Sequence, residues 1–581
     1  MAPNLLVCIA IAISLGTRPV SGGSLSDIEH VVVFMQENRS WDTYFGTMPG
    51  VRGFNDPNVQ VNSDGNSVWH QLVEPAQSNK TKTLLPWYLG YQGGDWHDAI
   101  QCMVAGSNGY EENQQSLNNG LNNHWVTKNT PWSWGYLKRQ DIPVQFAIAE
   151  GWTSGDMYQE SQITATNPNR VTLVSGSINV PGSPQDKDQG GVYIDNNEVP
   201  GCDDHGINCY PLKWKTVYDF YEEAGVSWQL FQDTNNFDDN PLAWFQQFQT
   251  ASKNSPLAKK GMSFVGLDSF YQAAANGTLP EISFIVGPSE LSEHPPYMPK
   301  DGAWLQKKIV DAVTSSPKYN STLLMISFDE TGGFGDHVTP FHSPKNTPGE
   351  WMQDPPGYVL EYLYHNSQIL FVEEWLTARG YKNITTDQMV LWRRKHMSNL
   401  VNALDLDHPD YSLPDLPDAG TLDTNEKGEY TGTSNCQARH KQTRPDVPYG
   451  EQNNATDVNT LWFEEGFKEV VGYLTEGRYL VFEKNGAAIT NPARGNSLVT
   501  SDTSAQHNNK SQRWVIHYND DEQSRAFTIS SALDGRWVGP GGALLPKSQS
   551  ANAAQVHFTF LGGGLGYTLH GYKVFSVTFR D

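Results

Sequence analysis

The sequence predicts an α/β fold with a mostly parallel sheet covered by helices, followed by an all-β module at the C-terminal end. From residue 28 to about 400, short β-branched runs alternate with helical patterns, as in parallel sheets whose connections are helices. Beyond residue 476, short alternating strands and turns follow one another, as in RYLVFEKNG and QRWVIHYND. The two patterns therefore indicate two differently built parts.

Apolar runs predict the strands of the first part, namely HVVVF (30–34), VTLVSG (171–176), ISFIVG (282–287) and TLLMISF (322–328). Helical spacing of apolar residues predicts helices over WKTVYDFYEEAG (214–225) and AWLQKKIVDAVTSS (303–316). Residues 406–460 are rich in Pro, Asp, Gly and Asn with little periodicity, which favours an irregular connector.

These patterns divide the chain into four segments. The 581 residues are enough for more than one hydrophobic core. We expect a signal peptide (1–23), a large α/β domain (24–405), a connector with a closing helix (406–475) and the all-β module (476–581).

Charge and the N-terminal sequence bear on partners and location. Forty Lys and Arg against 64 Asp and Glu give a net charge of -24, which argues against binding nucleic acid or an anionic membrane through a broad basic face. The apolar run from Leu5 to Leu15, followed by small and polar residues, is typical of a secretory signal removed near residues 20–24. The run is short for a membrane span, so we expect a secreted, extracellular protein without a transmembrane segment.

Cysteines and glycosylation motifs agree with export. Once the signal has left, four cysteines remain, an even number suited to two disulfides, and we expect the pairs Cys202–Cys209 and Cys102–Cys436. Sites for N-linked glycans are expected at Asn79, Asn276, Asn320, Asn383, Asn454 and Asn509. Asn38 also begins such a motif, but we expect it to be buried and bare.

Polar side chains follow two of the predicted strands directly. Glu37 and Asn38 come after the strand 30–34, and Asp329 and Glu330 come after the strand 322–328. Ligands bind beyond the carboxyl ends of strands in open α/β sheets, where hard oxygen ligands gathered together suit a divalent cation. The alternative is that each acidic pair caps a helix or a turn.

Four longer motifs carry a resemblance to a known family. IEHVVVFMQENRSWDTYFGTMPGVRGF, TNPNRVTLVSGS, SEHPP and ISFDETGGFGDH, in this order, resemble signatures of the phosphoesterase family, which contains bacterial non-haemolytic phospholipases C and a related acid phosphatase. The resemblance covers about residues 28 to 400. It implies an alkaline-phosphatase-like catalytic domain, with a nucleophile next to a metal and a phosphoenzyme intermediate.

The resemblance assigns roles to individual residues. It implies that Glu37, Asn38, Asp329 and Glu330 bind the metal together with Thr166, the hydroxyl residue two before the proline of TATNPNRV. Thr166 would be the nucleophile, because a divalent metal lowers the pKa of a bound hydroxyl and orients it. Thr164 and Ser161 are competitors for that role, and without the resemblance Thr166 would be a turn residue.

Further residues would contact the substrate or support the site. His294 in SEHPP resembles the family histidine that contacts the phosphoryl group or the leaving oxygen. Asn169 and Asp336 are expected to bind substrate, and His337 to support catalysis from the loop that carries the metal pair. A structural role is the alternative for either histidine.

One segment departs from the family. Bacterial members carry two histidines before the nucleophile segment, whereas SNGYEENQQSLNNG has Asn108 and Gln114 at about those places. His97 and His124 are near but out of register. Part of the phosphate pocket is therefore altered, which leaves substrate preference and catalytic competence open.

The sequence as a whole favours a secreted, metal-dependent phosphoric ester hydrolase that cleaves phosphodiesters, including phospholipids, through a threonine phosphoenzyme. An acid phosphatase using the same residues is one alternative, and a catalytically weakened protein that binds phosphorylated or glycosylated surfaces is another. One divalent ion is expected. Oxygen ligands disfavour a thiolate-type zinc site but leave calcium, magnesium, manganese, iron and zinc open.

Overall fold

The computed structural model describes residues 23–178, 196, 211–236, 238–340, 363–407, 409–452, 461–464, 474, 479–505, 507, 509–518, 526–560, 567–571 and 576–578. Residues 1–22 of the expected signal peptide lie outside these residues. The same is true of Cys202, Cys209 and Asn454. Within the described ranges, no helix has both the length and the apolar character needed to cross a bilayer.

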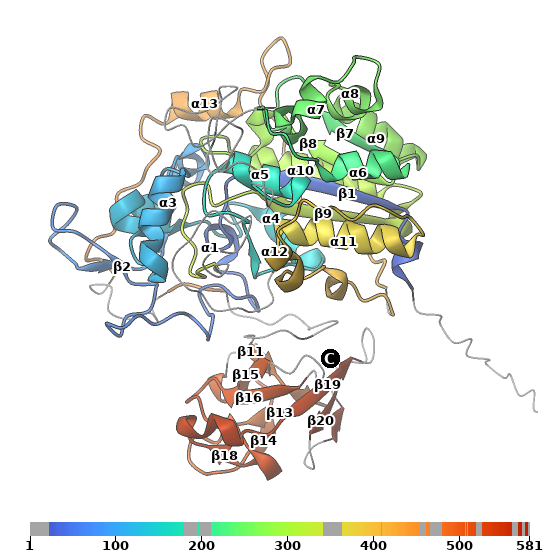
Figure 1. The fold of residues 1–581 in the computed structure, drawn as a ribbon. Helices are drawn as coiled ribbons and strands as arrows, with labels where there is room; N and C mark the ends of the chain where they lie inside the picture. Colours follow the sequence, from blue (N-terminus) through green and yellow to red (C-terminus); the bar gives the residue numbers. More distant parts are fainter. Residues whose placement is uncertain are drawn as a thin grey trace, which may run out of the picture.

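The larger part contains a four-stranded parallel sheet, which lies on the right of this part in Figure 1. Its order is β7 (Trp228–Gln232), β8 (Ile282–Val286), β1 (His30–Gln36) and β9 (Thr322–Phe328). Each neighbouring pair is parallel. The α/β class and three of the four predicted strands are thus confirmed, whereas β7 was not predicted.

Helices cover both faces of this sheet. Apolar residues of β1 alternate between two cores, because successive side chains of a strand point to opposite faces. The odd-numbered ones pack with α5 (Thr166–Ser175), α6 (Val217–Ala224) and α11 (His365–Ala378). The even-numbered ones pack with α9 (Leu267–Asn276) and α10 (Pro299–Thr314). Both predicted helices occur, as α6 and α10.

The prediction of a strand over VTLVSG (171–176) is wrong, because these residues form most of helix α5. Within it, the hydroxyl groups of Thr172 and Ser175 donate to carbonyls four residues earlier. Gly176 ends the helix with a φ of 87°, a conformation that favours glycine. The β-branched residues of this run have a local preference for strand. Their packing against the sheet as part of a helix outweighs this preference.

The remaining elements of the larger part are short. The helices are α1 (Trp41–Phe45), α2 (Trp96–Ala99), α3 (Tyr110–Leu117), α4 (Pro143–Gly151), α7 (Gln246–Gln249), α8 (Pro256–Gly261), α12 (Leu391–His396) and α13 (Gly432–Arg439). The strands are β2 (Gln71–Leu72), β3 (Thr83–Leu84), β4 (Trp87–Tyr88), β5 (Gly135–Tyr136), β6 (Tyr158–Gln159) and β10 (Leu363–Tyr364).

A separate aromatic-rich core lies among residues 44–146, and it includes Phe334 from the loop after β9. This loop is therefore packed into the protein. The expected Cys102–Cys436 disulfide is present and joins α13 to the turn after α2.

The C-terminal part consists of antiparallel strands (Figure 1), as the sequence predicts. One sheet contains β11 (Tyr479–Val481), β15 (Arg513–Tyr518), β16 (Phe527–Ser531), β17 (Trp537–Val538), β18 (Leu544–Leu545), β19 (Val556–Phe560), β20 (Tyr567–Gly571) and β21 (Ser576–Thr578). A second contains β12 (Glu483–Lys484), β13 (Ala487–Thr490) and β14 (Val499–Asp502). Trp514 is fully buried in the core of this part, which favours a structural role for its aromatic strand.

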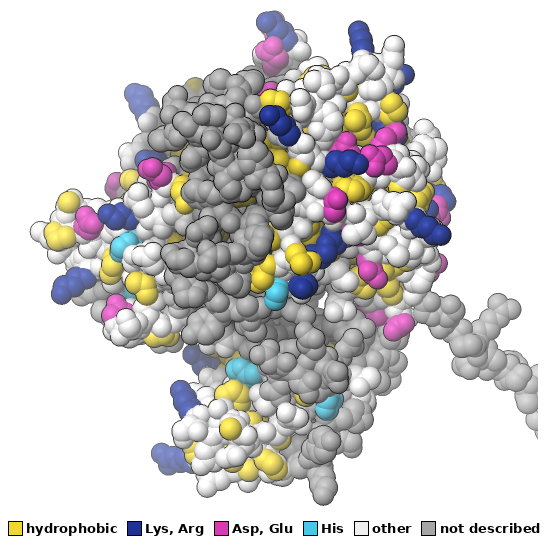
Figure 2. All heavy atoms as spheres, viewed as in Figure 1, with side chains coloured by type: hydrophobic (Ala, Val, Ile, Leu, Met, Phe, Trp, Pro, Cys, Tyr) yellow, Lys and Arg dark blue, Asp and Glu magenta, His cyan; other side chains and the backbone are white. Residues whose placement is uncertain are grey.

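Charged side chains and the expected glycan acceptors lie on the surface of the described residues. On the face in Figure 2, acidic and basic side chains of the described residues are interspersed. The expected glycan acceptors that the structure describes are all exposed, namely Asn79, Asn276, Asn320, Asn383 and Asn509. Asn38 is 0% exposed. Glycosylation itself stays a prediction.

Candidate active site

The two polar pairs that follow strands lie side by side. β1 and β9 are neighbours, and Gln36 pairs with Phe328 at their carboxyl ends. The next residues are therefore adjacent: the backbone N–H of Asn38 donates to Asp329 Oδ1 over 3.0 Å. Glu37 and Glu330 are buried like these two.

Close backbone packing shapes this strand edge. Asn38 has a φ of 64°, and Gly332, in the loop after β9, has a φ of 67°. A Cβ atom at Gly332 would lie 2.0 Å from the carbonyl oxygen of Asn38. At Gly333 it would lie 2.7 Å from the Gly106 carbonyl. The loop after β9 can therefore approach Asn38 and Gly106 this closely because Gly332 and Gly333 have no side chains.

Arg170 connects helix α5 to the strand ends. Its guanidinium nitrogens lie 3.1 Å from Glu37 Oε1, 3.3 Å from Asp329 Oδ2 and 3.6 Å from Asp239 Oδ2. All of these side chains are at most 6% exposed. Thr166 lies four residues before Arg170 in α5, so the two share a helix face.

The cluster holds more carboxyl groups than Arg170 can neutralise. Burial raises the pKa of Glu37 to about 7 and that of Asp329 to about 6, although Arg170 lowers both. Burial and the charge of Asp329 raise the pKa of Glu330 well above its usual value. Asp239 and Glu160 are shifted in the same direction, again mainly by burial. Ionising the whole cluster requires further positive charge.

In charge and ligand type the cluster fits a divalent cation. Glu37 Oε2 is buried and receives no hydrogen bond, and the Asp239 carboxyl lies next to Glu37. A hard cation bound by carboxylate and amide oxygens would supply the missing charge. In the described residues, this cluster contains no three acidic, His or Cys side chains whose ligand atoms all lie within 4.8 Å of one another. Among the described residues, such a group occurs elsewhere, at Asp42–Asp336–His337. Asp98, Cys436 and His440 also lie close together, but Cys436 is bonded to Cys102 and offers no thiolate.

Thr166 is the first residue of α5 and is 3% exposed. The N-terminal end of a ten-residue helix favours an anion such as a phosphoryl group. Of the competitors, Ser161 donates its hydroxyl to Asn366 Oδ1 over 3.3 Å, and Thr164 is 1% exposed.

The side chain of Asn169, in the first turn of α5, contacts the segment that precedes this helix. Its Oδ1 accepts from the backbone N–H of Gln162, and its Nδ2 donates to the carbonyls of Gln162 and Ala165. A weaker contact of 3.4 Å reaches Glu160 Oε2. These contacts hold the segment before Thr166 and do not favour the expected substrate contact.

Burial lowers the pKa of His294, and the contact with the Pro295 carbonyl and the charge of Asp239, a member of the acidic cluster, oppose this effect. Its Nδ1 lies 2.8 Å from the Pro295 carbonyl oxygen, and its backbone N–H donates to Ser292 Oγ over 3.1 Å. The first contact assigns the proton of the neutral ring to Nδ1.

Asp336 and His337 belong to a neighbouring cluster. The ring nitrogens of His337 lie 2.9 Å from Asp42 Oδ2 and 3.0 Å from Asp56 Oδ2, and its ring stacks on Trp69. The two oxygens of Asp336 accept backbone N–H groups of Asp42 and Val338. Both residues therefore attach the loop after β9 to α1, which favours a supporting role.

The segment that departs from the family has one residue at the site. Asn108 donates through Nδ2 to Glu330 Oε1 over 2.6 Å and contacts Asn38 Oδ1 at 3.4 Å. Gln114 donates to the Ile163 carbonyl instead, and so holds the segment before Thr166. His97 contacts Tyr88.

Sequence reasoning missed four residues of this region: Glu160, Arg170, Asp239 and His365. Arg170 stands in the NPNR motif, which could have drawn attention to it. His365 donates through Nε2 to the Asp329 carbonyl, 2.7 Å away, and its Nδ1 accepts from the Tyr158 hydroxyl. Burial lowers its pKa to about 4, so it is neutral. No strand-end position marks it in the sequence.

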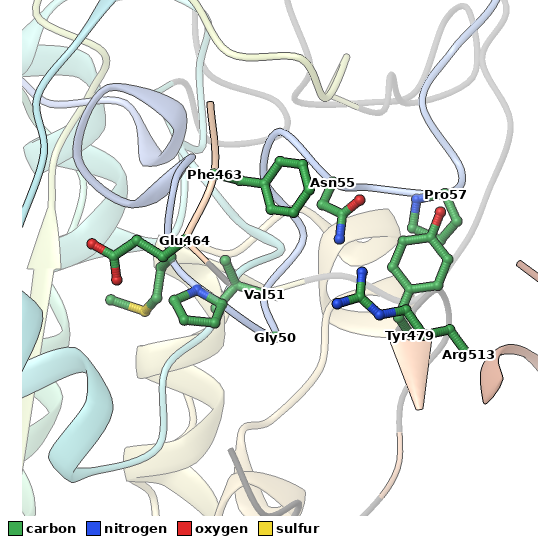
Figure 3. A pocket seen from close by; sticks show the side chains of 10 residues that line it. Gly50, Val51, Asn55, Pro57, Phe463, Glu464, Tyr479 and Arg513 are labelled. Carbon is green, nitrogen blue, oxygen red and sulfur yellow. The ribbon is translucent and has the colours of Figure 1, made fainter. Parts of the chain in front are cut away.

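A small pocket lies elsewhere, where the 48–57 segment meets the C-terminal part (Figure 3). Val51 and Asn55 line it on one side, and Tyr479 and Arg513 line it on the other. It contains none of the candidate site residues.

Comparisons with known proteins agree with the motifs. The model of the phosphoesterase family matches residues 28–370. The chain is 33% identical over 445 residues to the non-hemolytic phospholipase C of Pseudomonas aeruginosa, covering 69% of this chain and 60% of that protein. It is 30% identical over 473 residues to the non-hemolytic phospholipase C of Burkholderia pseudomallei, covering 70% and 63%. The chain thus spans less than two thirds of the length of either relative.

Proposed function

Because the chain belongs to the phosphoesterase family, we propose that it is a phospholipase C-like hydrolase of phosphoric esters that uses one divalent metal ion and Thr166 as nucleophile. One observation carries the proposal. The strand-end residues Glu37 and Asp329 share a buried acidic cluster with Arg170, which stands one turn after Thr166. We take the fold of this part to be alkaline-phosphatase-like.

The metal ligands in this proposal are Glu37, Asn38, Thr166, Asp329 and Glu330. When bound, the cation lowers the pKa of the nucleophilic hydroxyl and balances charge on the phosphoryl oxygens. Asn108 orients Glu330 and Asn38 through its amide. Arg170 contacts both Glu37 and Asp329 and lowers their pKa, which favours the ionised form that binds a cation.

The reaction has two displacements. The Thr166 oxygen forms a bond to phosphorus while the bond to the leaving alcohol breaks, and the departing oxygen takes a proton. This is the proton that Thr166 loses: His294 accepts it on Nε2, which carries no proton in the neutral ring because Nδ1 donates to the Pro295 carbonyl, and then passes it to the leaving oxygen. Water then attacks the phosphothreonine, the bond to Thr166 breaks, and the hydroxyl regains its proton.

The substrate class is proposed to be phosphodiesters, including phospholipids, because both relatives are phospholipases C. We also propose that the protein is secreted and glycosylated, which rests on the N-terminal sequence and on the exposed glycan acceptors.

Parallel assays on p-nitrophenyl phosphorylcholine and p-nitrophenyl phosphate, with and without a chelator, test this function. Chelator-sensitive cleavage of the diester is expected, and Thr166→Ala is the matched control for contaminating activity. Cleavage of the monoester alone would replace the proposal with an acid phosphatase. If metal-loaded protein cleaves neither the diester nor the monoester, the remaining alternative is a catalytically weakened protein that binds phosphorylated or glycosylated surfaces.

A further inference from the structure

One buried carboxyl group beside the candidate site has no role in the reaction proposed above. Glu293 directly precedes His294 in the chain and is 0% exposed. Its side chain lies between β1, α1, α4 and α10, each of which contributes a contact. A buried carboxylate is costly unless it is well hydrogen-bonded, so its surroundings are informative.

Four donors surround this carboxyl group. Oε1 accepts from the side-chain amides of Gln306 at 2.6 Å, Gln36 at 3.2 Å and Gln145 at 3.4 Å. Oε2 accepts from the hydroxyl of Tyr44, which itself accepts from Arg39 Nε. The donors come from elements distant in sequence, and all point at one side chain.

The backbone also requires such an anchor. Glu293 has a φ of 71°, which is uncommon for a residue with a side chain. The opposing helix has no side chain at the contact: a Cβ atom at Gly302 of α10 would lie 2.1 Å from Glu293 Cγ. Gly302 therefore makes room for Glu293, and the side-chain contacts stabilise a left-handed turn just before His294.

The same segment is tied to the strand end that carries Glu37. The Glu37 N–H donates to the Ser292 carbonyl over 3.1 Å, and the His294 N–H donates to Ser292 Oγ. Gln36, one of the four donors, is the last residue of β1. Displacing Glu293 would therefore move His294 relative to the acidic cluster.

We propose that Glu293 is a positioning residue that fixes His294 against the acidic cluster by anchoring the left-handed turn between them. The inference rests on the proposed function for its kinetic consequence only. Its structural content, the placement of the His294 ring, can be measured separately.

Charge contributes to this anchor. An ionised Glu293 can accept from all four donors, whereas a protonated one must itself find an acceptor. Burial raises the pKa of Glu293 to about 7, against the lowering effects of Tyr44 and Arg39. Those two are the titratable and charged groups facing it from α1 and the preceding segment, while β1, α4 and α10 contribute neutral amides.

The test compares Glu293→Gln with Glu290→Gln, a carboxylate of the same segment that contacts Asn235 near the surface. In Glu293→Gln we expect kcat to fall about a hundredfold with KM nearly unchanged, because a small displacement of a catalytic group is costly. The acidic limb of the pH profile should move as well. In a His294→Gln background the same substitution should cost less than about threefold, because its effect runs through His294.

A readout independent of turnover is the NMR signal of the His294 ring, identified by its loss in His294→Gln. It should shift in Glu293→Gln and not in Glu290→Gln. If Glu293→Gln does not fold, Gln306→Met removes one donor at similar volume and should shift the same signal. An unshifted signal in either folded variant overturns the inference, and so does full additivity with His294→Gln. Absence of turnover in the wild type would refute the proposed function, and the NMR comparison would still decide the placement.

Discussion

Arg170 and Asp329 form a buried ion pair, with Nε 3.3 Å from Oδ2 and both side chains at most 1% exposed. The same guanidinium contacts Glu37 and Asp239. One cation from a helix thus holds together carboxyl groups from two strand ends and a loop, in the region where a metal ion is proposed to bind.

Replacing Arg170 with methionine should destabilise the protein by about 3–5 kcal/mol, because buried carboxylates lose their partner. A divalent ion should restore part of this loss by supplying charge to the same cluster. Urea unfolding with and without Mn²⁺ measures both effects. Lys215→Met, which breaks an exposed pair with Glu223, is the control and should cost at most about 1 kcal/mol. Equal costs for the two variants would argue against a central role for Arg170.

Thr166→Ala should abolish phosphate ester hydrolysis and leave metal bound, since the attacking oxygen and only one of the proposed ligands are removed. Thr166→Ser should keep measurable activity, because the hydroxyl remains and only a methyl group that restricts its rotamer is lost. Steady-state kinetics and metal analysis measure these outcomes. If Thr164→Ala is inactive and Thr166→Ala is not, the nucleophile has been assigned to the wrong threonine. If both are active, metal-bound water is the better candidate.

Glu37→Gln and Asp329→Asn should each lower metal occupancy sharply with little change in far-UV circular dichroism. The substitutions remove charge from proposed ligands and keep their volume. Elemental analysis after gel filtration measures the bound ion, and Glu111→Gln, on the exposed side of α3, is the control. Full occupancy in both variants would remove the proposed metal site.

Gly332→Ala should reduce metal binding and activity together. The added methyl would lie 2.0 Å from the Asn38 carbonyl oxygen, so one of the two strand-end segments must move. Gly428→Ala separates this clash from the cost of a positive φ, because Gly428 has a φ of 81° and open space around its Cβ position. Metal titration and kinetics on both variants test the point. Similar behaviour of the two would show that the close approach is unimportant.

His337→Gln should destabilise the protein in a pH-dependent way. Burial opposes the charge on His337, but Asp42 and Asp56 outweigh it and raise its pKa well above the usual value of 6.5. Because the pKa of His337 is higher in the folded than in the unfolded protein, its protonation stabilises the folded state fully below pH 6.5. This stabilisation is lost as the pH rises through the pKa of His337 in the folded protein. The difference in unfolding free energy between wild type and variant should therefore be largest below pH 6.5 and shrink above it. Urea unfolding at several pH values measures this, with His97→Gln as a half-exposed control. A constant difference would contradict a charged His337.

The sequence predicted the parts of the fold whose signals are local. β1, β8 and β9 are continuous apolar runs, and two of them are followed by the polar pairs that meet at the strand edge. β7 reads WQLFQ, in which two glutamines interrupt the run, so it was missed. The run in α5 is β-branched and predicts a strand, because only packing against the sheet distinguishes the two.

The candidate site was predictable only where it is built from strand ends. Glu37 and Asp329 could be placed together because parallel neighbours bring their carboxyl ends to one edge. Glu160, Asp239 and His365 come from loops and a helix start. Their approach depends on how those elements cross the sheet, and no periodicity in the sequence encodes that.

The central place of β1 has a consequence for how the protein comes to be folded. Of the four strands in its sheet, β1 is made first, yet both its neighbours, β8 and β9, lie about 250 residues or more further along the chain. Until residue 328 has left the ribosome, the apolar strand β1 therefore has at least one edge without its hydrogen-bonding partner. Sheets dominated by such distant pairings assemble slowly. We therefore expect synthesis to outpace folding of this part, and the nascent chain to depend on chaperones over that interval.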